Sequence, residues 1–163
     1  MSDGIGFLGQ EEIRRFDDLL VSFLGETQAR CALLVDRAGR LITAAGDTAT
    51  LDDTTFASLA AADFAASDQL AVLLGESEFS SLYHHGDQRS MYLADIGGRA
   101  ILAALFDNRV TLGMVRITSK AMVPRFGEIL EELVKHGPRG DLTHMDSAWA
   151  EEVEDEIDRL FSE

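Results

Sequence analysis

The sequence is poor in cysteine and in basic residues. Its 163 residues include one cysteine, Cys31, and its 14 lysines and arginines stand against 29 aspartates and glutamates. A single cysteine excludes an intrachain disulfide and favours a cytoplasmic protein. Because Cys31 falls within a β-prone run, we expect it to be a small buried apolar residue rather than a reactive thiol.

Long apolar runs are also missing. No uninterrupted run approaches the length of about 18 residues that indicates a membrane-spanning helix, so we predict no membrane insertion. The first four residues, Met1–Gly4, lack the basic start of a signal peptide. The net charge of −15 argues against binding to nucleic acid or to anionic lipid, since both carry negative phosphates.

The first half of the chain alternates helical and strand-like patterns. Apolar residues at helical spacing predict a helix over residues 10–24, ended by Gly25. Short apolar runs over residues 31–35 and 40–46 flank a tight turn and predict an antiparallel hairpin. A second, alanine-rich helix is expected over residues 54–74.

Three strands and a last helix follow. The strands are predicted over residues 79–85, 90–96 and 99–106, and the third is apolar almost without interruption, which indicates a central strand covered on both faces. We expect one helix over residues 111–135, kinked at Pro124 because proline removes a helical hydrogen bond. The order α-β-β-α-β-β-β-α predicts an α/β (α+β) sandwich with a five-stranded, mainly antiparallel sheet.

The C-terminal part has a different composition. Residues 1–136 are expected to form the domain, residues 137–145 a flexible glycine- and proline-containing linker, and residues 146–163 an acidic helix with a charge of −7. A narrow apolar stripe runs along this helix. Its members are Trp149, Val153, Ile157, Leu160 and Phe161. Such a stripe suits the groove of a partner, although docking onto the chain's own domain is the alternative.

The alanines of the second helix have two interpretations. Ala61, Ala62, Ala65 and Ala66 are small enough to let another backbone approach closely. Alanine is also the best helix former, so the same residues are compatible with a helix that contacts no other helix.

Motifs of common enzymes are missing from the sequence. It contains no phosphate-binding loop, no Gly-x-Ser-x-Gly and no His-Glu-x-x-His. His84 and His85 are adjacent on a predicted strand, so their side chains point to opposite faces and form a poor metal pair. We therefore expect no enzyme active site and no cofactor.

Several segments together resemble a known family. Residues 34–42, with the sequence LVDRAGRLI, resemble the first hairpin of the Roadblock/dynein light chain superfamily. Residues 73–79, 90–92 and 105–116 are similar to the bacterial MglB branch, and so is the ending at residues 157–163. The order and spacing of these segments are more specific than any one of them.

The resemblance implies a GTPase-activating protein. Members are homodimers whose alanine-rich helices pack across a two-fold axis and whose sheets join edge to edge. Two copies bind one Ras-like GTPase of the MglA type and stimulate its GTP hydrolysis without inserting an arginine. The resemblance thus assigns a dimer or GTPase interface to Ala61, Ala62, Ala65, Ala66 and Gln69.

The same resemblance also implies a role for the C-terminal helix and a cellular process in which the protein acts. The helix contacts the GTPase away from the nucleotide and aids nucleotide exchange, and the output is front–rear polarity in cell motility, with enrichment at a cell pole. Two other functions remain open, a non-catalytic scaffold for a GTPase or polarity complex and a small-ligand sensor. The acidic tail favours the GTPase regulator, because a scaffold does not require it.

Overall fold

The computed structural model describes residues 8–136 and 159–160 and contains three helices and five strands in the predicted order. Their bounds are α1 Gln10–Thr27, β1 Cys31–Asp36, β2 Leu41–Gly46, α2 Asp53–Leu73, β3 Ser81–His85, β4 Arg89–Ile96, β5 Ala100–Asp107 and α3 Leu112–His136. The predicted linker, 137–145, and most of the predicted tail helix lie outside the described residues.

The five strands form one antiparallel sheet in the order β2-β1-β5-β4-β3. Strand β5 pairs with both β1 and β4, and the prediction of a central strand is confirmed. All six residues of β1 and six of the eight in β5 are buried. These two strands lack an alternating polar face because side chains on both faces of the sheet are covered.

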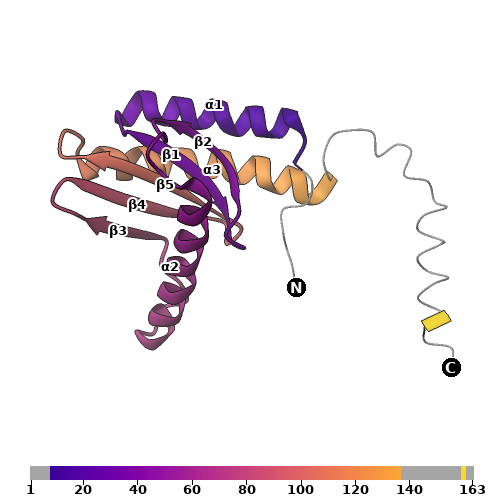
Figure 1. Cartoon of the computed structure of the whole chain (residues 1–163). Helices are drawn as coiled ribbons and strands as arrows, with labels where there is room; N and C mark the ends of the chain where they lie inside the picture. Colours follow the sequence, from indigo (N-terminus) through magenta and orange to yellow (C-terminus); the bar gives the residue numbers. More distant parts are fainter. Residues whose placement is uncertain (1–7, 137–158, 161–163) are drawn as a thin grey trace.

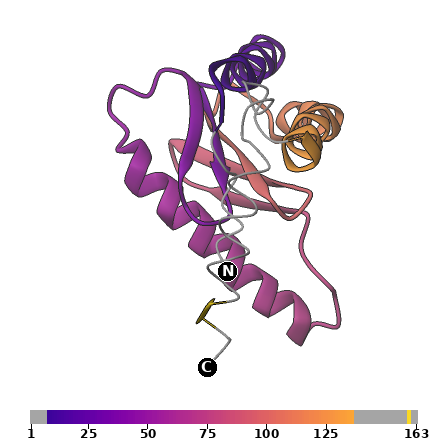
Figure 2. The same ribbon diagram turned by 90° about the vertical axis from the view of Figure 1, so that its right-hand side faces the viewer.

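The helices cover the two faces of the sheet unequally. Figures 1 and 2 show α1 and α3 side by side on one face and α2 alone on the other. The two-helix face holds the larger core, in which the rings of Phe16 and Phe126 stack with their centroids 6.2 Å apart. A smaller core under α2 contains Phe64, Leu33 and Ile101, which are fully buried.

The turn between β1 and β2 lies directly against α2. Gly39 has a φ of +89°, and a Cβ atom built there would lie 3.1 Å from the Ser58 Cα of α2. Glycine fits because it tolerates positive φ and carries no side chain. The Asp36 carboxylate stabilises the turn by accepting hydrogen bonds from the Arg40 backbone N–H at 2.8 Å and from its guanidinium at 3.1 Å.

The first helix ends later than the sequence suggested. The prediction that Gly25 ends it is wrong, since α1 continues to Thr27 and Gln28 takes the left-handed conformation at φ 62°. The Thr27 hydroxyl donates to the Phe23 carbonyl at 2.9 Å, and the Gln28 N–H donates to the Leu24 carbonyl at 2.9 Å. These two bonds satisfy carbonyls of the last turn, so the helix needs no glycine to end.

Helix α2 is, by length and composition alone, apolar enough to cross a membrane, although one third of the tested 18-residue window is buried in this fold. Uninterrupted runs did not reveal this property, because aspartates and serines separate its apolar residues.

The Asp52 carboxylate caps the N-terminus of α2. It accepts hydrogen bonds from the backbone N–H of Thr55 at 3.1 Å and from the Thr55 hydroxyl at 2.7 Å.

Candidate functional site

The outward side of α2 is an exposed apolar surface. Leu59, Leu70 and Leu73 are 64%, 56% and 81% exposed, and Val72 and Leu74 are exposed as well. A surface leucine is ordinary by itself, but several along one helix indicate a site of interaction.

The outward residues of α2 recur at steps of three and four. Leu59, Ala62, Ala66, Gln69 and Leu73 follow one another at this spacing, which places them on one side of the helix. Ala62 and Ala66 are exposed between the larger leucines. Leucines separated by small residues form a surface onto which a second helix can pack closely. We call these five residues the α2 stripe.

The residues predicted as one interface divide between two sides of α2. Ala62, Ala65, Ala66 and Gln69 are exposed. Ala61 is only 7% exposed and belongs to the small core under α2, so the structure corrects the grouping of Ala61 with the outward alanines. The helix has apolar residues on both sides, and the sequence pattern could not tell which side the sheet would cover.

Arg37 connects the inward side of α2 to the sheet through ion pairs. Its guanidinium pairs with Asp68 of α2 at 3.4 Å and with Asp95 of β4 at 2.5 Å. It also lies over the ring of Phe64, 4.7 Å from the centroid. These contacts join the β1–β2 turn, α2 and β4, and they fix the direction in which the α2 stripe faces.

The sheet face under α2 is incompletely covered. Five strands spaced about 4.8 Å apart span about 19 Å between the outer strand axes, whereas a helix with side chains is about 10–12 Å wide. Leu41 on β2, Leu82 on β3 and Met91 on β4 are accordingly only partly buried beside α2. Strand β3 also pairs only with β4 in the described part of the chain, which leaves its outer edge open.

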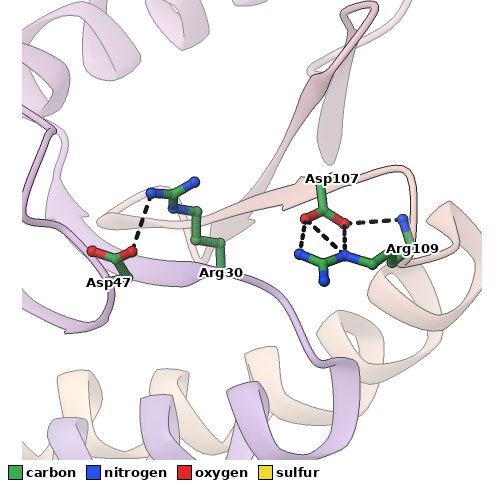
Figure 3. Close-up of polar contacts among 4 residues, drawn as sticks. All are labelled: Arg30, Asp47, Asp107 and Arg109. Atoms are coloured by element: carbon green, nitrogen blue, oxygen red, sulfur yellow. Dashed lines mark hydrogen bonds and ion pairs between the residues drawn. The ribbon is translucent and has the colours of Figure 1, made fainter.

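A charged cluster lies at the end of the sheet where β2 and β5 finish. Arg30 pairs with Asp47, and Asp107 pairs with Arg109 (Figure 3). The nitrogen and oxygen atoms of these pairs are 3.1 Å and 2.8 Å apart, and the four residues line a cavity of about 520 Å³. The hydrogen bond from Arg109 lowers the pKa of Asp107 and raises that of Arg109. Each of these four charges already has a partner, so the cluster joins neighbouring loops and forms no acid–base pair.

The other candidate groups have structural surroundings. Cys31 is 1% exposed, which confirms that it is a buried apolar residue. His84 on β3 contacts Asp63 of α2, with Nε2 and Oδ2 2.7 Å apart. Within residues 8–136 and 159–160, no group of three or more histidines, cysteines and acids is placed to hold a metal ion.

The predicted C-terminal stripe is largely outside the described residues. Leu160 is helical and 77% exposed. Trp149, Val153, Ile157 and Phe161 are not among the described residues. Their role as a GTPase-binding helix stays a prediction.

A family model described as the Roadblock/LC7 domain matches residues 15–106, more than half of the chain. The chain belongs to the Roadblock/LC7 family. The matched region runs from α1 to β5 and includes α2 with its stripe. No curated protein matches the chain by sequence.

Within this family the chain is similar to proteins of the MglB type. Myxococcus xanthus MglB shares 36% sequence identity over 78% of this chain and 96% of its own, with a TM-score of 0.74. A gliding protein MglB from Thermus thermophilus shares 31% over 81% of this chain and 99% of its own, with the same TM-score. A Roadblock/LC7 domain from Streptomyces avermitilis, at 14% identity, 71% and 97% coverage and a TM-score of 0.65, shares the fold.

The burial of Cys31 gives a first prediction. Burial raises the pKa of its thiol to about 11, which leaves on the order of one thiol in a thousand ionised at pH 8. We expect iodoacetamide at pH 8 to leave the native protein unmodified over minutes and to alkylate it fully in guanidinium chloride, as measured by mass spectrometry. Stoichiometric labelling of the native protein would contradict this placement of Cys31.

Proposed function

We propose that this chain regulates a Ras-like small GTPase of the MglA type, acting as a homodimer that stimulates GTP hydrolysis. The observation that carries the proposal is the α2 stripe, an exposed apolar surface on a helix that covers only part of its sheet. The similarity to MglB proteins over more than three quarters of the chain supports it.

The incomplete cover of the sheet supports the proposed homodimer. A second α2, packed on the first through the α2 stripe, supplies apolar contact for Leu59, Leu70 and Leu73. The open edge of β3 then lies beside its own copy, and two sheets join through backbone hydrogen bonds. An MglB structure with a tetrameric arrangement, 31% identical to this chain, supports self-association.

Substitution of Ala62 tests the dimer. We expect Ala62→Arg to weaken self-association at least tenfold, because it places a charge in an apolar contact. Ala62 is exposed in the isolated chain, so circular dichroism should remain unchanged while light scattering reports a smaller mass. Ala121→Arg, the same change at an exposed position of α3, is the matched control. A full-sized assembly for Ala62→Arg would exclude this surface from the dimer contact.

The GTPase supplies the catalytic groups in this proposal. The sequence has no phosphate-binding loop, so the chain acts by holding the partner's loops in a hydrolytic arrangement. Among the arginines that could act as a finger, Arg109 is already bound to Asp107 through its side chain. In this mechanism the surface on α2 positions the loops of the GTPase and does not insert an arginine into its active site.

The activity test measures GTP hydrolysis by the cognate MglA-like GTPase with and without this chain. We expect stimulation. The arginines to exclude as fingers are Arg89, Arg99, Arg109 and Arg116, and we expect each single alanine substitution to retain stimulation within about tenfold at saturating protein. Loss of an arginine finger would cost about 10³–10⁵ in rate. A loss of that size at one arginine would overturn the mechanism. Binding without stimulation would instead identify the chain as a non-catalytic scaffold.

The acidic C-terminal segment is proposed as a second contact with the GTPase. Its charge of −7 favours a basic patch on the partner, and its covalent connection to the domain raises the effective concentration of the second contact. In this role it aids nucleotide exchange while the α2 surfaces hold the main contact.

Deletion of residues 146–163 separates the two contacts. We expect the truncated protein to remain a folded dimer, to bind the GTPase about tenfold more weakly at low salt, and to lose its effect on nucleotide exchange. The difference from the full chain should shrink at high salt, because salt screens the attraction between the segments. Equal affinities and equal exchange rates for the two forms would reduce the segment to a solvated tail.

The cellular role proposed here is cytoplasmic control of polarity and motility, with enrichment at a cell pole. The gliding protein MglB of Thermus thermophilus supports this setting by its similarity. Fluorescence microscopy of a tagged chain, in cells with and without the GTPase, tests the polar location.

A further inference from the structure

A second cavity lies on the opposite face of the sheet from α2. It measures about 480 Å³ and lies between α3 and the β3–β4 hairpin. Tyr92 of its lining belongs to the larger core, on the side covered by α1 and α3. The cavity is therefore separate from the α2 stripe, and the proposed GTPase contact does not use it.

Two cations line this cavity. Arg116 and Lys120 are one turn apart on α3, so both side chains lie on the same side of the helix. Both are exposed, and neither forms an ion pair with any described residue. The chain has twice as many acids as bases, so two neighbouring cations without a carboxylate partner are unusual in it. Such a pair can bind an anion.

The buried hydroxyl of Ser119 adds an independent observation. Ser119 lines the cavity, is 1% exposed, and its Oγ has no hydrogen-bond partner among the described residues. Buried hydroxyls are normally bonded, because an unmet polar atom loses its bonds to water without replacement. Ser80 and Ser81, at the start of β3, bring further hydroxyls to the same cavity.

Asp95 is the acidic residue that borders the cavity, and its carboxylate is directed to the α2 side of the sheet, where Arg37 lies over Phe64. Asp95 pairs with Arg37 at 2.5 Å and accepts a hydrogen bond from the Gly98 N–H at 3.0 Å. Its charge is therefore compensated by a cation from the β1–β2 turn. The uncompensated charge in the cavity is the positive charge of Arg116 and Lys120.

The rest of the lining is apolar. Tyr92, Val123 and Pro124 form part of the wall, and the volume lies in the range of pockets that hold small organic ligands. We propose that this cavity binds an organic phosphate monoester, with the phosphate on Arg116, Lys120 and the Ser119 hydroxyl and the organic group on the apolar wall. Guanidinium, ammonium and hydroxyl donors are the usual partners of phosphate oxygens.

Calorimetric titration of the full chain at low salt tests the proposal with three probes. Phenyl phosphate has both the phosphate and the apolar organic group, whereas inorganic phosphate lacks the apolar group. A phosphoserine peptide presents a phosphate monoester on a polypeptide. We expect phenyl phosphate to bind more tightly than inorganic phosphate. Tighter binding of the phosphopeptide, lost in its unphosphorylated form, would assign the phosphate to a protein partner and would support the same site.

Substitutions in the cavity test whether phenyl phosphate binds there. We expect Arg116→Gln with Lys120→Gln to weaken phenyl phosphate about tenfold or more, and Ser119→Ala to weaken it severalfold. Arg125→Gln, the loss of one positive charge at an exposed position of α3 outside the cavity, is the control for each charge removed and should change affinity less than twofold.

The stability of Ser119→Ala is a second readout. Its melting temperature should equal or exceed that of the parent, since the hydroxyl bonds no described residue. No binding of phenyl phosphate or of the phosphopeptide at millimolar concentration, or equal weakening by Arg125→Gln, would overturn the proposal. Neither result would affect GTPase regulation, which depends on the other face of the sheet.

Discussion

The structure depends on a sheet whose central strands must be covered on both faces. Strands β1 and β5 have almost no polar residues, so water must be excluded from either side of them. Two helices cover one face, and a single helix covers the other. The two-helix face holds the larger core, while the one-helix face leaves apolar side chains exposed on α2 and partly buried along the neighbouring strands. This inequality leaves apolar surface exposed on the second face.

The placement of α2 relies on polar contacts as well as on apolar burial. Arg37 pairs with Asp68 and Asp95 and lies over Phe64, so one side chain joins three elements. Apolar burial alone is non-directional and would allow α2 to turn about its axis. Charged groups with fixed partners prevent that rotation. The same residues of α2 therefore always face outward. A recognition surface on a helix requires such a fixed orientation.

Most of the fold could be predicted because each element has a local pattern. The unbroken apolar run of β5 and the turns between strands were sufficient to predict the order of the elements along the chain and the central position of β5. The end of α1 could not be read from Gly25, since the capping bonds of Thr27 and Gln28 decide it. The sides of α2 were ambiguous because apolar residues occur around the whole helix. The phosphate cavity was missed because Ser80 and Ser119, far apart in the sequence, border one cavity only after α3 packs against β4.

The central position of β5 also determines when the sheet can form. Strand β1 pairs with β2 on one side at once, through a short turn, but its other side pairs with β5, which follows α2 and two further strands in the chain. During synthesis the N-terminal hairpin therefore leaves the ribosome before β5 is made, and one edge of β1, a strand in which only Asp36 is charged, stays unpaired until then. Closure of such a distant pair is slow compared with hairpin formation, and open edges favour aggregation in the interval. The aggregation risk of this chain during synthesis is therefore concentrated in the interval before β5 pairs with β1.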